Sequence, residues 1–158
     1  MVMCVQSVQW IFGYSKDVIG GVQSLTKSGR NALFTISAHS GIIYDFEFRT
    51  QTVLQGHCNF ISCCAISKDK RWIVTADAGT DSLLVVWDSH SGAPVKTLFN
   101  PHPSGICSVD ISDDALFVTT LSQPDEVRVK KDYLIAAFDN CCLFVLFCIL
   151  AHSYLMPL

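Results

Sequence analysis

Short runs of β-branched and aromatic residues alternate along this chain with breaks that carry Gly, Asp, Ser and Pro. Runs of about five to seven residues bounded in this way are typical of strands. The pattern is clearest in the middle of the chain, where four such runs follow one another. It predicts an all-β fold. The four strands are expected at about 60–66, 72–76, 83–88 and 94–99.

The pattern repeats at an offset of 45 residues. The segment ISKDKRWIVT (66–75) lies over ISDDALFVTT (111–120), and each reads as a strand end, a polar turn and a β-branched strand. A weaker copy, LTKSGR (25–30), comes before them. Periods in this range indicate stacked supersecondary units. Further strands are expected at about 18–26, 32–38, 41–47 and 50–55 in the first unit, and at 105–112 and 116–121 in the third.

Two dipeptides mark the middle unit. Gly56–His57 opens it, and Trp87–Asp88 ends its third strand. This spacing resembles one blade of the WD40-repeat family of β-propellers. Tyr44–Asp45 has the equivalent place in the first unit. The sequence therefore predicts a partial WD40 β-propeller of about two and a half four-stranded blades. The blades are expected at about 15–55, 56–100 and 101–129.

The repeat is expected to stop near residue 130. Val127–Val129 begins another strand, but Lys130–Lys131 stand where an aromatic residue is expected. The prediction is a propeller domain over 1–129 and a divergent apolar tail over 130–158. The apolar run of the tail, 141–151, is shorter than the roughly 20 residues that span a bilayer, so membrane insertion is the less favoured use. Val8–Tyr14 is expected to belong to an earlier strand.

The number of blades has a physical consequence. Propellers typically close with about 4 to 8 blades, and each blade buries its faces only against its neighbours. An open stack of under three blades leaves apolar faces and strand edges in water. We therefore expect a piece of a larger product or a truncated variant, with marginal stability and a tendency to self-associate.

Charge and cysteine usage narrow the function classes. The net charge is −3, and the 11 Lys and Arg form no long cluster, so no nucleic-acid partner is expected. The eight cysteines form no CxxC pair, and MVMCVQSVQW lacks a signal-peptide layout, which predicts reduced intracellular thiols. Cys63 and Cys64 would point to opposite faces of a strand and could not share a metal ion. No metal or cofactor is expected.

Four residues of the middle unit carry groups that could do chemistry: His57, Thr75, Asp81 and Trp87. A relay with Thr75 as nucleophile is conceivable. The favoured interpretation is structural, because these residue types tie a WD40 blade together by satisfying buried polar groups. Asp81 is the expected carboxylate, with Asp77 as the alternative, and no enzymatic activity is expected. Solvated loops are expected for the remaining histidines, His39, His90, His102 and His152.

The middle blade also resembles one particular family. Residues 54–99, above all RWIVTADAG followed by TDSLLVVWDS, look like a blade of the cilia- and flagella-associated protein 251 family. The resemblance extends more weakly to 10–14, 38–44 and forward to about 129. It implies a non-enzymatic scaffold at the axoneme of motile cilia, near the radial-spoke base, that supports spoke assembly and beating.

The partners that the resemblance implies are subunits of the calmodulin- and spoke-associated complex and of the radial-spoke base, together with doublet microtubules. The calcium-binding region of the family's longer form has no counterpart in this sequence, so no calcium binding is expected. Two alternatives stay open. One is a microtubule-associated WD-repeat protein of the echinoderm type, and the other is a membrane-anchored WD40 adaptor that uses the tail. Without the resemblance, the expected location is cytoplasmic.

Overall fold

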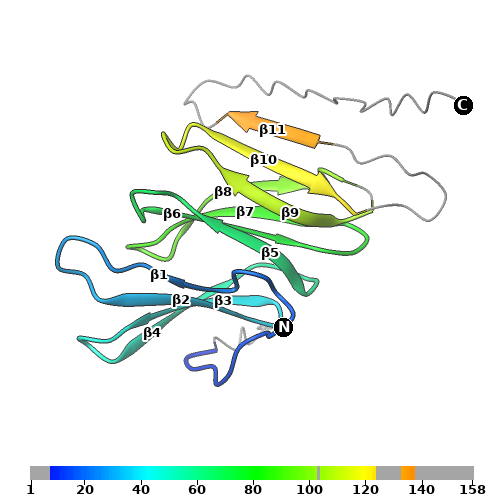
Figure 1. Ribbon diagram of the computed structural model, residues 1–158. Coiled ribbons are helices and arrows are strands. Elements are labelled where there is room, and N and C mark those ends of the chain that lie inside the picture. The colour runs from blue at the N-terminus through cyan, green and yellow to red at the C-terminus, as the bar shows by residue number, and fades with distance from the viewer. Residues whose placement is uncertain (1–7, 103, 124–132, 138–158) are drawn as a thin grey trace, which may run out of the picture.

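Three antiparallel sheets are stacked in this computed structural model, which describes residues 8–102, 104–123 and 133–137 (Figure 1). In each sheet, strands that are neighbours in sequence pair with one another. Sheet 1 contains β1 (Val22–Ser24), β2 (Ala32–Ser37), β3 (Ser40–Asp45) and β4 (Thr50–Gln55). Sheet 2 contains β5 (Ile61–Ile66), β6 (Trp72–Asp77), β7 (Leu83–Asp88) and β8 (Pro94–Phe99). Sheet 3 contains β9 (Ile106–Ile111), β10 (Phe117–Ser122) and β11 (Tyr133–Ala137).

The architecture confirms the predicted fold class, an all-β partial β-propeller. The four strands of sheet 2 begin and end within one residue of their expected positions. They were predictable because each turn between them carries its own polar residues. Ser67 and Asp69, for example, accept hydrogen bonds from the backbone amides of Trp72 and Arg71, which ends one strand and starts the next.

The core lies between the sheets and has two parts. One cluster joins sheets 1 and 2 around Phe34, Ile73 and Trp87. The other joins sheets 2 and 3 around Val74 and Ile106. Sheet 2 is therefore covered on both faces, which explains why the central strands WIVTAD and LLVVWD are almost wholly buried instead of alternating. Sheet 2 depends on both of its neighbours for this burial.

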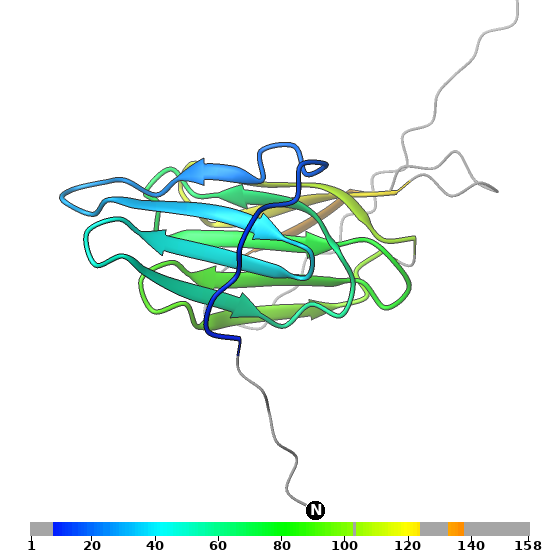
Figure 2. The ribbon, with the colours of Figure 1, turned by 90° about the horizontal axis from the view of Figure 1, so that it is seen from below.

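The N-terminal segment differs from its prediction. Residues 8–15 form no strand but run across the outer face of sheet 1 (Figure 2). The Ile11 amide donates to Gln51 Oε1 at 2.9 Å, and Gln51 Nε2 donates back to the Ile11 carbonyl at 3.1 Å. Because a side chain of β4 satisfies this backbone, the segment needs no strand partner. It covers part of the outer face, where Ile42 is only 2% exposed.

The predicted boundary at residue 130 is also corrected. Strand β11 (Tyr133–Ala137) pairs antiparallel with β10, so part of the expected tail belongs to sheet 3. The prediction placed the end of the repeat at residue 130 by assuming the spacing of the middle unit. It did not include β11 because the connection after β10 is longer than the one after β6. The remaining predicted tail, 138–158, and the predicted strand start at 127–129 lie outside the described residues. In the ranges that the structure describes, no helix is both long and apolar enough to cross a bilayer.

Candidate functional site

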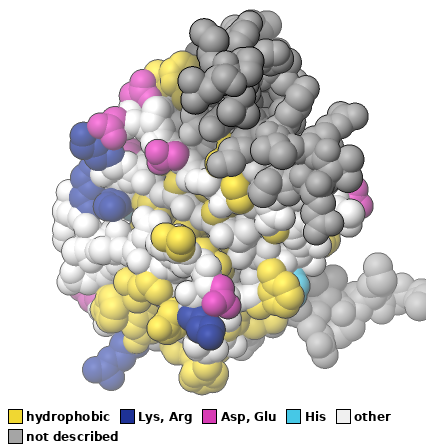
Figure 3. All heavy atoms as spheres, turned by 45° about the vertical axis from the view of Figure 1, so that its right-hand side comes forward, with side chains coloured by type: hydrophobic (Ala, Val, Ile, Leu, Met, Phe, Trp, Pro, Cys, Tyr) yellow, Lys and Arg dark blue, Asp and Glu magenta, His cyan; other side chains and the backbone are white. Residues whose placement is uncertain are grey.

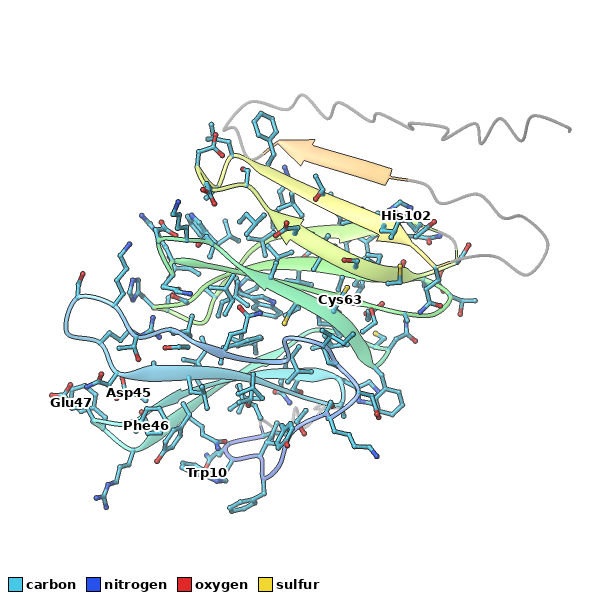
Figure 4. All side chains as sticks on the ribbon, in the orientation of Figure 1. Trp10, Asp45, Phe46, Glu47, Cys63 and His102 are labelled. Atoms are coloured by element: carbon cyan, nitrogen blue, oxygen red, sulfur yellow. The ribbon has the colours of Figure 1, made fainter. Side chains whose placement is uncertain are left out.

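A chain of buried hydrogen bonds runs through sheet 2. Trp87 Nε1 donates to Thr75 Oγ1 at 2.8 Å, and Thr75 Oγ1 lies 2.7 Å from His57 Nε2. His57 Nδ1 lies 2.7 Å from Asp77 Oδ2, and Asp77 Oδ1 accepts from the Leu83 amide at 2.9 Å. These hydrogen bonds connect His57, which precedes β5, to strands β6 and β7. Cys63, labelled in Figure 4, lies on the neighbouring strand β5.

The direction of each hydrogen bond in this network follows from which groups can donate. Trp87 can only donate, and an ionised Asp77 can only accept. Burial lowers the pKa of His57 and outweighs the attraction of Asp77, so the close His57–Asp77 pair is a hydrogen bond to a neutral imidazole. The imidazole proton therefore sits on Nδ1 and is donated to Asp77, while the Thr75 hydroxyl donates to Nε2. Every polar side-chain atom of these four residues therefore has at least one hydrogen-bond partner.

Acidification is expected to destabilise this arrangement. The pKa of His57 in the folded chain lies below its ordinary value of 6.5, so the unfolded chain takes up a proton that the folded chain resists. The contribution of neutral His57 is complete above about pH 6.5 and is lost as the pH falls through the folded pKa. Urea unfolding between about pH 7.5 and pH 5 tests this. The slope should be smaller for His57→Gln, and an equal slope in the two proteins would contradict the assignment.

The carboxylate of the network is corrected from Asp81 to Asp77. Asp77 is fully buried at the end of β6, two residues after Thr75, so both side chains point to the same face. Asp81 is exposed in the following turn with a φ of 60°, a backbone state that Asp tolerates better than most residues. The alternation of side chains along β6 is the sequence signal that distinguishes the two.

Thr75, His57 and Asp77 have the order of a Ser/His/Asp relay, yet the geometry does not suit catalysis. Thr75 is 0% exposed, so no substrate carbonyl can approach its hydroxyl. Its oxygen also accepts the Trp87 indole N–H, which holds the hydroxyl proton toward His57. A nucleophile needs access as well as a base. The network holds the blade together and offers no open reaction site.

Sheet 3 repeats part of the network, which the sequence-based prediction missed. His102 Nε2 lies 2.8 Å from Thr120 Oγ1. His102 and Thr120 each come 45 residues after their counterparts His57 and Thr75, which is the offset of the repeat. His102 is 3% exposed, so its expected place in a solvated loop is wrong. His102 lies in the segment that leads into β9, and Ser82 Oγ donates to its carbonyl. Figure 4 shows His102 at the end of sheet 3 where β9 begins.

The aspartates of Trp87–Asp88 and of its equivalent Tyr44–Asp45 have the same role. Asp88 Oδ1 accepts from the amides of His90 and Ser91 at 2.8 and 3.0 Å. Asp45 Oδ1 accepts in the same way from the amides of Glu47 and Phe48, and Figure 4 shows Asp45 next to Phe46 and Glu47. Both carboxylates close the turn after the third strand of a sheet. Gly56 completes the arrangement, since a Cβ there would lie 3.3 Å from the Trp87 ring.

The adjacent cysteines of β5 belong to different core clusters. Cys63 packs between sheets 2 and 3, and Cys64 packs toward the cluster between sheets 1 and 2. Burial raises the pKa of Cys63 to about 12 and that of Cys64 to about 11. Both are therefore protonated thiols at neutral pH, whereas metal ligation requires thiolates. Among the described residues, no group of three or more His, Cys, Asp or Glu is placed to hold a metal ion.

Comparison with known proteins identifies the family. The model of the CFAP251 N-terminal domain matches residues 6–131, which is most of the chain. The chain is 48% identical over 117 residues to cilia- and flagella-associated protein 251 of Tetrahymena thermophila, covering 74% of this chain and 12% of that protein. This chain belongs to the CFAP251 family.

Other members of the CFAP251 family show the same relation. The mouse (Mus musculus) protein is 42% identical over 125 residues, which cover 78% of this chain and 9% of the mouse protein. The Chlamydomonas reinhardtii protein is 37% identical over 119 residues, covering 75% of this chain and 15% of the algal protein. The matched region spans between 9% and 15% of the length of these relatives. All of them are named as cilia- and flagella-associated proteins.

Solved structures support the fold of this CFAP251-family chain. The β-propeller domain of Myceliophteria thermophila Cps50 (Swd1) superposes with a TM-score of 0.55 at 14% identity, over 68% of this chain and 32% of that chain. Hydrazine synthase of Kuenenia stuttgartiensis superposes with a TM-score of 0.56 at 16% identity, over 67% of this chain and 30% of that chain. At these identities the likeness concerns the propeller fold alone.

The exposed surface of the chain includes a group of aromatic side chains beside sheet 1. Trp10 packs edge-on against Tyr44, which in turn packs edge-on against Phe46. Trp10 and Phe46 are about half exposed, and Phe12 is 88% exposed. Figure 3 shows hydrophobic side chains gathered on the lower side of the molecule, where sheet 1 lies in Figure 1. Exposed apolar patches of this kind mark interaction surfaces more often than isolated apolar residues do.

Proposed function

We propose that this chain is a non-enzymatic protein-binding scaffold of the WD40 type in motile cilia, placed on the axoneme near the base of the radial spokes. The match of residues 6–131 to the CFAP251 family carries the proposal. The relatives are named for cilia and flagella, and their identity to this chain reaches 48%. The partners proposed are subunits of the calmodulin- and spoke-associated complex, spoke-base subunits and doublet microtubules.

The structure supports a binding role over a catalytic one. The groups that could do chemistry, His57, Thr75 and Asp77, are buried and bonded to one another. The surface offers instead rigid turns at the sheet ends and exposed aromatic side chains such as Phe12 and Phe48. A stack of sheets that fixes its loops in space is well suited to present them to other proteins.

Tagged expression in a ciliated cell tests the proposal. The chain is expected to stay with detergent-extracted axonemes and to copurify with spoke-base subunits. A variant with Trp87→Ala, which weakens the fold, should lose both properties and serves as the control. Retention in the cell body with recovery of chaperones alone would contradict the proposal. Recovery in a membrane fraction that resists carbonate would favour the membrane-anchored adaptor instead.

A further inference from the structure

A pocket of about 280 Å³ opens where three turns from sheets 1 and 2 meet. These turns connect β1 to β2, β5 to β6 and β7 to β8, and Figure 1 shows them at the same end of the sheets. Its volume is near the lower limit of about 300 Å³ for ligand pockets, which suits one or two side chains of a bound peptide. The lining includes Leu25, Lys27, Arg30, Asp69, Lys70 and His90.

Hydrogen bonds to and from the buried Ser89 hold the three turns together. Arg30 Nη1 donates to Ser89 Oγ at 3.0 Å, and Arg30 Nη2 donates to the Ser89 carbonyl at 2.6 Å. Ser89 Oγ in turn donates to the Lys70 carbonyl at 2.7 Å. Ser89 is 1% exposed. Ser89, in the turn between β7 and β8, therefore bonds to one residue of each of the other two turns. The pocket exists before any ligand binds, which lowers the entropic cost of binding.

The turn between β1 and β2 places two cations side by side. Lys27 and Arg30 pair through both backbone hydrogen bonds, at 3.2 and 3.0 Å, across Ser28 and Gly29. Ser28 and Gly29 have φ values of 49° and 88°, as in the tight turns that join paired strands. Directly opposite residues point to the same face, and like charges there repel. An anion between Lys27 and Arg30 would relieve that repulsion.

The positive charge of the pocket is offset only in part, because the lining holds one carboxylate, Asp69, beside Lys27, Arg30 and Lys70. Nearby cations outside the lining are paired, since Lys68 lies 2.8 Å from Asp113 and Arg71 lies 3.6 Å from Asp88. Within the described part of the chain, no carboxylate lies within 4.0 Å of the Lys27 or Lys70 ammonium groups, and Arg30 bonds only neutral groups. This positive site is local, because the whole chain has a net charge of −3.

The remaining groups favour a peptide over a compact polyanion. Partial burial acts to raise the pKa of Asp69, but hydrogen bonds from Ser67 and the Arg71 amide, with the charge of Lys27, lower it. Asp69 is therefore ionised, repels a phosphate cluster and can accept a backbone N–H. Arg30 Nη1 lies 3.2 Å from His90 Nδ1, and since arginine only donates, His90 accepts there and has its donor on Nε2. Leu25 adds an apolar surface.

From these contacts we infer that the pocket binds an acidic peptide segment of a partner protein, with glutamate or aspartate side chains taken by Lys27, Lys70 and Arg30 and a backbone amide taken by Asp69. This rests on the proposed role in protein binding and specifies the chemistry of one partner. Single carboxylates spaced along a peptide match cations spaced over three turns better than one multiply charged group does.

Fluorescence anisotropy with the full chain and a labelled hexaglutamate peptide tests the assignment. Lys27→Glu/Lys70→Glu is expected to weaken binding by about tenfold, because two charge contacts are lost and repulsion replaces them. Lys70→Glu alone should weaken it by about threefold. The matched control is Lys16→Glu, an exposed lysine outside the pocket lining, with a change below about twofold. Circular dichroism checks that each variant is folded.

Three outcomes would overturn the inference. Equal peptide affinity of the chain and Lys27→Glu/Lys70→Glu would remove the pocket as the site. Equal losses from Lys70→Glu and Lys16→Glu would show attraction by general charge alone. Binding of a single-stranded RNA oligonucleotide as tight as that of the peptide, with the same loss in the double variant, would assign a nucleic acid instead. The assay uses purified protein and synthetic peptide, so a failure of ciliary placement leaves its result unchanged.

Discussion

Replacement of Trp87 by alanine is expected to lower the free energy of unfolding by about 3 to 5 kcal/mol, the usual cost of removing a large buried aromatic side chain. Trp87 is 2% exposed and lies in the cluster between sheets 1 and 2. Its indole also donates to Thr75, so the substitution both opens a cavity and takes a donor from the network. Because domains of this size are stable by only about 5 to 15 kcal/mol, the variant is expected to be partly unfolded at about 37 °C.

Urea unfolding followed by far-ultraviolet circular dichroism measures the loss, since tryptophan fluorescence changes with the substitution itself. Trp87→Phe keeps most of the ring and removes the N–H, so about 1 to 2 kcal/mol of the loss should remain. Trp10→Ala is the control for removing an indole, because Trp10 is 43% exposed. A loss for Trp87→Ala no larger than for Trp10→Ala would show that Trp87 is not buried between two sheets.

Asp77→Asn is expected to cost about 2 to 4 kcal/mol, because a buried amide cannot replace both acceptors of the carboxylate. One oxygen accepts from the Leu83 amide and the other from His57 Nδ1. In the variant, one of these donors faces an NH₂ group and stays unsatisfied without access to water. The side chain is fully buried, so relaxation toward solvent cannot restore the lost bond.

Asp81→Asn is the matched control, since it makes the same chemical change four residues later in an exposed turn. Asn tolerates the φ of 60° there, so the change in stability should stay within about 0.5 kcal/mol. Chemical denaturation of both variants at about pH 7.5 compares their free energies of unfolding directly. A larger loss for Asp81→Asn than for Asp77→Asn would return the network carboxylate to the residue that the turn pattern favoured.

The strands of sheet 2 could be predicted closely because local chemistry sets their limits. The turn at 67–71 closes with Ser67 and Asp69 as side-chain acceptors. Ser112 and Asp114 recur at the same places in the next repeat and accept from the Phe117 and Leu116 amides. Burial on both faces added the uninterrupted apolar run at 83–87. Such signals lie within a few residues of one another, so one sequence is enough to find them.

Other features depend on spatial neighbours that the sequence does not show. The strand β11 follows a longer connection, so residue counting from the middle blade placed the end of the repeat too early. The hydrogen bonds of Arg30 to Ser89 join residues 59 positions apart on different sheets. Nothing local predicts that pairing. Asp77 is an intermediate case, since the alternation along β6 with Thr75 could have found it.

The fold and the proposed binding function share a cause. Sheet 2 is covered on both faces and its Ser89 bonds to Arg30 and to the Lys70 carbonyl, so the packing of sheet 2 sets where the turns of the pocket lie. Destabilising the buried network is therefore expected to reduce binding at the turns without touching them. Substitutions of Lys27 and Lys70 should do the opposite: they should weaken binding and leave stability nearly unchanged.

Amide hydrogen exchange of the full chain tests the central claim most directly, namely that sheet 2 is buried between two other sheets. Strands β2, β3, β6 and β7 all lie inside their sheets and have hydrogen-bonded neighbours on both sides. Of these four strands, β6 and β7 are covered by another sheet on both faces, whereas β2 and β3 face another sheet on one side, so the amides of β6 and β7 should exchange more slowly than those of β2 and β3, at the rate of global unfolding. Exchange in β6 and β7 as fast as in β2 and β3 would contradict the stacked arrangement.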